Sequence, residues 1–274
     1  MLDTLFINTL LFGLIAFTLV TFAFLLATVR HNHTITDVWY APFVALSAIG
    51  TIIISNTMTP LAVLIATLMT IWALRLGFRA YIKQRRYGHA TSSVTWRQRW
   101  IMPHTDWPLA RVYIRSYIAQ MAMMILLGMP FLIALSAGKV LGSWYTVIGI
   151  TLVCIGLLYE TIADWQLDHF LMKKYHHSFE NIPLSQPLLS TGLFRYSRHP
   201  NYFGEIMLWS GLITIAWPVP YGYLGLMSLA LVLYILRITS VRMERSLLLR
   251  YPEAYQAYQQ TTAYVIPRRA RKQQ

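Results

Sequence analysis

Long runs of apolar residues, each about as long as a bilayer is thick, constrain this chain more than any other feature. A transmembrane helix needs about 20 apolar residues, and seven runs come near that length, at 5–29, 38–57, 60–82, 114–137, 141–164, 203–217 and 221–243. Backbone polar groups have no partners in lipid, and the period-2 alternation of barrel strands is absent, so helices are predicted. The expected fold class is therefore all-α: a polytopic integral membrane protein with seven transmembrane helices.

Composition agrees with this class. Apolar residues make up 56% of the 274 residues and charged residues only 12%, whereas soluble domains carry about 25% charged residues. The chain has no internal repeat, low-complexity tract or linker, so one transmembrane domain over 1–274 is expected. The apolar run at 5–29 is long enough to span and has no clear cleavage site, so it is not expected to be a signal peptide. The single cysteine, Cys154, lies in an apolar run, so no disulfide framework is expected, and it is predicted to be a small buried residue rather than a nucleophile.

Positive charges mark the orientation. The net charge is +13, but the basic residues cluster where apolar runs end, which is typical of membrane topology and not of nucleic-acid binding. Among the basic residues, only Lys139 falls in the short loops 57–60, 137–141 and 217–221. The amino terminus is therefore predicted outside and the carboxyl terminus in the cytoplasm, with the chain in the cytoplasmic (inner) membrane of a bacterium. The basic, tryptophan-containing segment 83–113 is predicted to lie at the membrane interface.

The densest polar stretch, residues 192–205, comes directly before the sixth apolar run and reads GLFRYSRHPNYFGE. Polar side chains at the end of a membrane helix cost free energy to bury unless they have a binding partner. Pro200 predicts the first turn of a helix, whose free amides favour an anion. Arg195, Arg198 and His199 suit phosphate oxygens, whereas Asn201, Tyr202 and Glu205 suit hydrogen bonds to a ring or ribose. We interpret this 192–205 segment as part of a cofactor site at the membrane surface.

Acidic residues are few, and three of them share one face of the helix that leaves the fifth run. Glu160, Asp164 and Asp168 are spaced i, i+4, i+8, so their like charges need donors or cations opposite them. Two interpretations stay open for Glu160 and Asp164: hydrogen bonds to a nucleotide, or structural ion pairs with Arg195 or Arg198. The histidines lack ligand spacing with carboxylates, so no metal site is expected.

Several motifs together resemble the bacterial DUF1295 proteins, which belong with the steroid 5-alpha-reductase-like membrane enzymes. The resemblance is most specific over 159–267. It rests on YETIADWQLDHF at 159–170, the 192–205 segment, Arg237, YPEAY at 251–255 and Ile266-Pro267, with Asp37-Val38-Trp39 and Trp72-Ala73-Leu74-Arg75 as amino-terminal landmarks.

This resemblance implies a seven-helix enzyme that binds NADPH from the cytosol and reduces an activated carbon–carbon double bond in a lipid or steroid-like substrate from the bilayer. It makes 159–267 the cofactor-binding part. The family's cofactor positions fall on Glu160, Asp164, Asn201, Glu205 and Arg237, with Arg195, Tyr196 and Arg198 in the same loop. Hydride transfer to an enone needs a donor for the carbonyl oxygen, and Asp37 and Tyr40 are the candidates for this catalytic role.

A second resemblance gives the alternative function. Arg198-His199-Pro200-x-Tyr202 is similar to an element of the isoprenylcysteine carboxyl methyltransferases and phospholipid methyltransferases, which use S-adenosylmethionine. Those enzymes carry an adjacent pair of glutamates after the last span, where this chain has the lone Glu244. A non-catalytic scaffold or transporter is disfavoured, because the polar groups gather at one surface and do not line the midplane.

Overall fold

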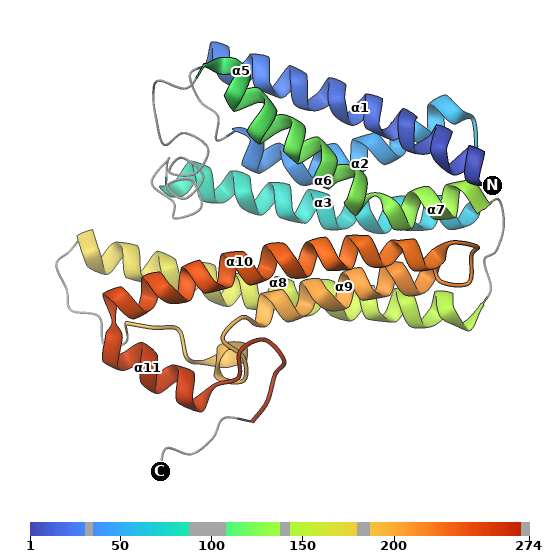
Figure 1. Ribbon diagram of the computed structural model, residues 1–274. Coiled ribbons are helices and arrows are strands. Elements are labelled where there is room, and N and C mark those ends of the chain that lie inside the picture. The colour runs from blue at the N-terminus through green and yellow to red at the C-terminus, as the bar shows by residue number, and fades with distance from the viewer. Residues whose placement is uncertain (31–34, 88–107, 138–142, 180–186, 270–274) are drawn as a thin grey trace. The chain divides into compact units, whose positions relative to one another are not determined.

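The computed structural model describes residues 1–30, 35–87, 108–137, 143–179 and 187–269, and within these ranges it consists of helices and connecting segments without a strand (Figure 1). The predicted all-α class is confirmed. Trp96, Trp100 and Trp107 of the interfacial segment 83–113 lie outside the described residues. In chain order the elements are α1 (Leu2–Val29), α2 (Ile35–Ser55), α3 (Pro60–Tyr87), α5 (Leu109–Val112), the π-helix η2 (Tyr113–Ile118), α6 (Ala119–Leu127), α7 (Met129–Ala137), α8 (Trp144–Phe179), the 3₁₀ turn η3 (Gly192–Arg195), α9 (Pro200–Ala216), the 3₁₀ turn η4 (Gly222–Gly225), α10 (Leu226–Arg250) and α11 (Pro252–Thr261).

The described helices are those of a multi-pass membrane protein. Five are long and apolar enough to cross a bilayer, and a bent pair formed by Leu109–Leu127 and Met129–Ala137 brings the number to six. The sixth predicted span corresponds to α9, which has 17 residues, fewer than the ~20 that cross a bilayer unaided. The count of seven spans stays a prediction.

The chain folds as two compact units. Unit 1 comprises Met1–Thr146 and Ile213–Ser228, and unit 2 comprises Val147–Leu212 and Leu229–Gln274. The prediction of a single domain over 1–274 stays a prediction. The 192–205 segment and the acidic face of α8 both belong to unit 2.

Unit 1 is held together by apolar packing and a few short polar contacts. In it α1 packs against α2, α6 and α7, and α3 packs against α2 and α7. The rings of Phe12 and Phe131 meet in this core with centroids 6.3 Å apart. Asn8 Nδ2 donates a hydrogen bond to Ser136 Oγ at 3.1 Å, which satisfies polar groups that lipid could not.

The fourth predicted span, 114–137, is bent and not straight. Its two halves meet at an angle of 49°. Pro130 lies just after the bend and has no N–H to continue the helical ladder. Gly128 sits at the break, where an added Cβ would lie 2.8 Å from the Phe12 ring, so the close approach of α1 requires glycine there.

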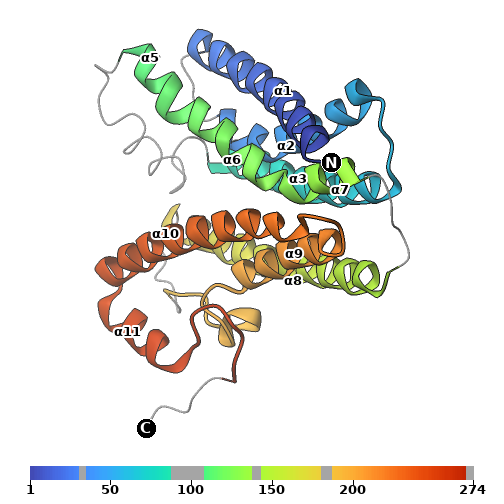
Figure 2. The same cartoon turned by 45° about the vertical axis from the view of Figure 1, so that its right-hand side comes forward.

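Unit 2 is built on a close approach of α8 and α9. An added Cβ on Gly204 would lie 2.7 Å from Glu160 Cβ, and one on Gly211 would lie 2.6 Å from the Gly149 carbonyl oxygen. Small residues allow helix backbones to come this close. The two contacts show that α8 and α9 run antiparallel, and Figures 1 and 2 show α10 lying alongside them.

The prediction that Cys154 is buried is wrong, because the structure places its side chain on the exposed side of α8. The apolar run that contains it is apolar on every side, so periodicity could not tell the packed face from the outer one. Leu158, one turn further on, is likewise 63% exposed. Such residues face lipid in a membrane helix.

Candidate functional site

The residues just before α9 are hydrogen-bonded to the last described residues of the chain. The C-terminal segment, residues 262–268, runs beside residues 196–199, and Ser197 and Ala263 form a parallel bridge. Arg198 N donates to the Ala263 carbonyl at 2.8 Å, and His199 N donates to the Tyr264 carbonyl at 3.2 Å. The hydroxyl of Ser197 donates to the Val265 carbonyl at 2.7 Å. The predicted helix start at Pro200 is confirmed, and its approach is fixed by these bonds.

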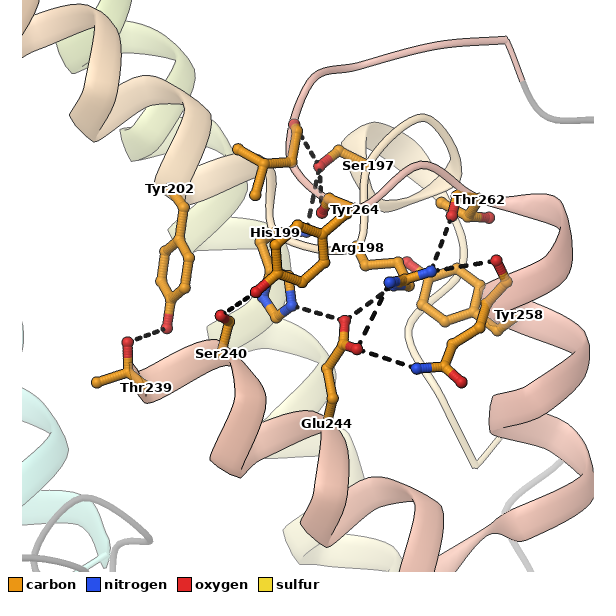
Figure 3. A network of polar contacts seen from close by, with 12 residues as sticks. Ser197, Arg198, His199, Tyr202, Thr239, Ser240, Glu244, Tyr258, Thr262 and Tyr264 are labelled. Atoms are coloured by element: carbon orange, nitrogen blue, oxygen red, sulfur yellow. Dashed lines mark hydrogen bonds and ion pairs between the residues drawn. The ribbon is translucent and has the colours of Figure 1, made fainter. Parts of the chain in front are cut away.

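Glu244 of α10 is the centre of the polar network in unit 2 (Figure 3). Its Oε1 accepts from Arg198 Nε at 2.9 Å and from His199 Nε2 at 2.9 Å. Its Oε2 accepts from Gln259 Nε2 at 2.9 Å. The side chains of Arg198 and Glu244 are each only 12% exposed, so solvent screens this pair weakly.

Arg198 also donates hydrogen bonds to backbone carbonyls. Its Nη1 donates to the carbonyls of Gln259 at 3.1 Å and Thr262 at 3.2 Å. Of the interpretations left open for Glu160 and Asp164, an ion pair with Arg198 is not formed, since the carboxylate partner of Arg198 is Glu244. Arg198 therefore braces α9 against α10 and against the segment that follows α11.

Tyr264 lies between two arginines. The guanidinium carbon of Arg198 is 5.4 Å from the centre of its ring, and that of Arg237 is 5.5 Å from it. Arg237 Nη1 also donates to the Tyr264 hydroxyl at 3.0 Å, and this hydroxyl is hydrogen-bonded to Ser240. The edge of the ring meets the imidazole of His199 with centroids 5.2 Å apart. The C-terminal segment therefore contributes a side chain as well as backbone bonds.

Two of the three acidic residues that share a face of α8 are buried, whereas Asp168 is half-buried. Glu160 is 5% exposed and Asp164 is 3% exposed. Because Gly204 meets Glu160 in the antiparallel pair, one further turn along α8 brings Asp164 to the level of the first turn of α9. Free amides at a helix start favour a carboxylate. Glu205 is half-buried on α9 and accepts a hydrogen bond from Trp209 Nε1 at 2.8 Å.

The other predicted site residues divide between the two units. In unit 2, Arg195, Tyr196 and Arg237 are exposed, whereas Asn201 and Tyr202 are half-buried in the first turn of α9. The Tyr202 hydroxyl donates to Thr239 Oγ1 at 3.1 Å. The proposed carbonyl donors, Asp37 and Tyr40, lie on α2 in unit 1. The structure thus brings ten predicted cofactor residues into one unit and leaves the two catalytic candidates in the other.

Helix α11 also contributes side chains to the contacts around the 192–205 segment. The hydroxyl of Tyr258 donates to the Phe194 carbonyl at 2.5 Å. Burial raises the pKa of Tyr258 above its ordinary value near 10, and nearby Arg198 only partly opposes that rise. Burial likewise raises the pKa of Tyr255. Both phenols therefore stay protonated through the physiological range and act as hydrogen-bond donors.

Sequence reasoning missed the roles of Glu244, Gln259, Tyr258 and Tyr264. Each meets the 192–205 segment across a wide gap in the chain, 46 residues for Glu244 and Arg198. A signal was nevertheless present, because Glu244 is one of only ten acidic residues and follows the last apolar run.

The arrangement offers two kinds of group to a ligand. Buried carboxylates on α8 can accept hydrogen bonds from amide or hydroxyl donors. The exposed guanidinium groups of Arg195 and Arg237 can hold an anion. In the part of the chain that the structure describes, no group of three or more histidine, cysteine, aspartate or glutamate side chains could hold a metal ion.

Comparison with known proteins identifies the family. The family model described as "Protein of unknown function (DUF1295)" matches residues 23–262. The uncharacterized protein C594.04c of Schizosaccharomyces pombe is 31% identical over 159 residues, which cover 53% of this chain and 45% of that protein. The match thus spans less than half of that relative's length, and no solved structure matches the chain. Because the family model covers most of the chain, the chain belongs to the DUF1295 family, as its motifs predicted.

Proposed function

From membership of the DUF1295 family, we propose that this chain is a membrane enzyme that uses NADPH to reduce an activated carbon–carbon double bond in a lipid or steroid-like molecule taken from the bilayer. The cytoplasmic membrane is its proposed location, with the cofactor entering from the cytoplasm. The family match supports a membrane enzyme, and the reaction is our proposal.

The burial of Glu160 and Asp164 is the observation that carries the proposal. Two carboxylates that are 5% and 3% exposed, one turn apart near the end of an apolar run, are expensive to keep there. Ionisable groups at membrane depth are functional candidates for that reason. The carboxamide and ribose of a dinucleotide provide N–H and O–H donors that suit these acceptors.

The residues of unit 2 fit the other parts of such a cofactor. Arg195 and Arg237 are exposed and provide positive charge for phosphate oxygens. Arg198 is assigned a different role from the one that its sequence position indicated, because its donors go to Glu244 and to backbone carbonyls. When bound, the nicotinamide would supply hydride, and the protein would orient the reacting groups and exclude water.

One observation favours the alternative, an S-adenosylmethionine-dependent methyltransferase. Glu244 contacts both Arg198 and His199, so the Arg-His-Pro element does meet a glutamate that follows the last apolar run. A single glutamate at this position nevertheless departs from the adjacent pair of the methyltransferases. The two functions differ in the nucleotide that binds, which gives a direct test.

The test is nucleotide binding to the detergent-solubilised full chain. We expect NADPH to raise the melting temperature, and S-adenosylmethionine to leave it unchanged. Asp164→Asn keeps the shape of the side chain and removes its charge, and a lost charge-assisted hydrogen bond weakens binding by roughly tenfold or more. Isothermal titration of NADPH into both proteins measures this difference.

The control is Asp3→Asn, which alters an exposed acid in the first turn of α1 and is expected to leave the affinity for NADPH unchanged. If S-adenosylmethionine raises the melting temperature and NADPH does not, the reductase proposal is wrong and the methyltransferase is supported. Equal affinities of wild type and Asp164→Asn for NADPH would show that the buried carboxylate of Asp164 does not bind the cofactor.

A further inference from the structure

We propose that Glu244 is a positioning residue for the ligand site. Its carboxylate holds His199 in the tautomer that carries the proton on Nε2, and this leaves Nδ1 as a hydrogen-bond acceptor for a ligand N–H or O–H group. The nature of the ligand rests on the proposed function, whereas the tautomer does not.

The contact between the two side chains fixes the proton. His199 Nε2 lies 2.9 Å from Glu244 Oε1. An ionised carboxylate can only accept hydrogen bonds, so Nε2 must be the donor. A partner on one ring nitrogen sets the state of the other in the same way at many histidine sites.

The Glu244 carboxylate that His199 contacts is shared with Arg198. The same Glu244 oxygen already accepts from Arg198, and Arg237 lies beyond the ring of Tyr264. One carboxylate is therefore already matched by one guanidinium. The His199 side chain is 1% exposed, and a second cation in that position would lose its hydration without gaining a second counter-charge. Nδ1 consequently holds a lone pair.

This lone pair is buried and has no hydrogen-bond partner within the described ranges. Unsatisfied buried acceptors are rare in folded proteins and call for an explanation. The rings of Tyr202 and Tyr264 pack on the imidazole, with centroids 5.0 and 5.2 Å away. A ligand that shifts one of these rings would bring its own donor to Nδ1. The carboxamide and the ribose hydroxyls of NADPH are donors of this class.

The tautomer is tested without any ligand. In the full chain labelled with [¹⁵N]histidine, the His199 signals are assigned by their loss in His199→Gln. We expect a protonated Nε2 and an unprotonated Nδ1 in the wild type, and a mixture of tautomers in Glu244→Leu, which removes both acceptor oxygens. Gln259→Ala is the matched control, because it removes another hydrogen bond of the same carboxylate and leaves His199 its partner. A wild-type imidazole protonated on Nδ1, alone or together with Nε2, would overturn the proposal, as would an unchanged tautomer in Glu244→Leu.

The acceptor role is tested with two variants of His199 and with NADPH and S-adenosylmethionine as probes. His199→Gln keeps a donor near the Nε2 position and has no atom at Nδ1, so we expect a melting temperature near that of the wild type and about tenfold weaker NADPH binding. His199→Asn keeps a polar atom near Nδ1 and loses Glu244, so its melting temperature without ligand should fall. Full NADPH affinity in His199→Gln would overturn the acceptor role. If neither probe binds the wild type, the proposed function and the acceptor role both fail, and the tautomer measurement still decides the role of Glu244.

Discussion

At the scale of single residues, Arg198 differs from the other arginines near the site in what its guanidinium contacts. It bonds one carboxylate and two carbonyls from α10, α11 and the segment that follows, whereas Arg195 is exposed. The sequence could show that both lie before a membrane helix, but not which of them is taken up by the protein. That distinction depends on Glu244, which is distant in the chain and whose approach is set by how α10 packs.

Replacing Arg198 should therefore destabilise the protein even without a ligand. In Arg198→Ala the largely buried Glu244 loses its guanidinium, and breaking a buried ion pair costs about 3–5 kcal/mol. Arg198→Lys should recover little of this loss, since an ammonium cannot bond a carboxylate and two carbonyls from one plane. The melting temperature of the solubilised protein, measured without nucleotide, reports the effect.

The control for this prediction is Arg268→Ala, because the Arg268 side chain is exposed and only its backbone N–H bonds to the Tyr196 carbonyl. We expect Arg268→Ala to change stability by less than about 0.5 kcal/mol. Equal melting temperatures for Arg198→Ala and Arg268→Ala would mean that the Glu244 network does not stabilise unit 2.

At the scale of elements, the lengths of the apolar runs predicted where helices occur, but not whether a helix is straight or bent. The runs at 5–29 and 60–82 correspond to α1 and α3, and Pro200 marked the start of α9. The bend at Gly128 was missed, because an apolar run has the same composition whether it is straight or broken. The pairing of α8 with α9 depends on glycines at matching positions, and no local pattern shows which helix each glycine meets.

The close contact of α8 and α9 gives a prediction for Gly204→Ala. The added methyl would lie 2.7 Å from the Glu160 backbone nitrogen and from its Cβ, so the helices must separate. Overpacking of this kind costs typically about 1–3 kcal/mol, and it would also displace Glu160 from its buried position. Thermal unfolding of the variant, followed by circular dichroism, measures the loss.

Gly13→Ala is the comparison, because an added Cβ there would meet only Ile125 at 3.4 Å, an ordinary contact. Alanine is a better helix former than glycine, so this variant should be as stable as the wild type or more stable. Loss of stability in Gly13→Ala as large as that in Gly204→Ala would show that glycine flexibility, and not helix proximity, is what matters.

At the scale of the whole molecule, the distribution of basic residues predicts the orientation in the membrane. Among basic residues, only Lys139 falls in the short loops assigned to the outside. In a Cys154→Ala background, we expect Lys139→Cys to react with an impermeant maleimide in intact cells and Lys272→Cys to react only after lysis. Labelling of position 272 in intact cells would show that the predicted orientation is wrong, and the arginines of unit 2 would then face away from cytoplasmic nucleotides.

The bridge between Ser197 and Ala263 has a consequence for biosynthesis. Ser197 and Val265, which are hydrogen-bonded, lie 68 residues apart in the chain, and a ribosome adds on the order of 5–20 residues per second. After Ser197 emerges, some seconds pass before its partner exists, and α10 is synthesised in that interval. The backbone N–H groups of Arg198 and His199 must bond to water meanwhile, at the membrane surface and not within lipid. A nascent chain that terminates before residue 262 would contain every apolar helix and still never assemble the site.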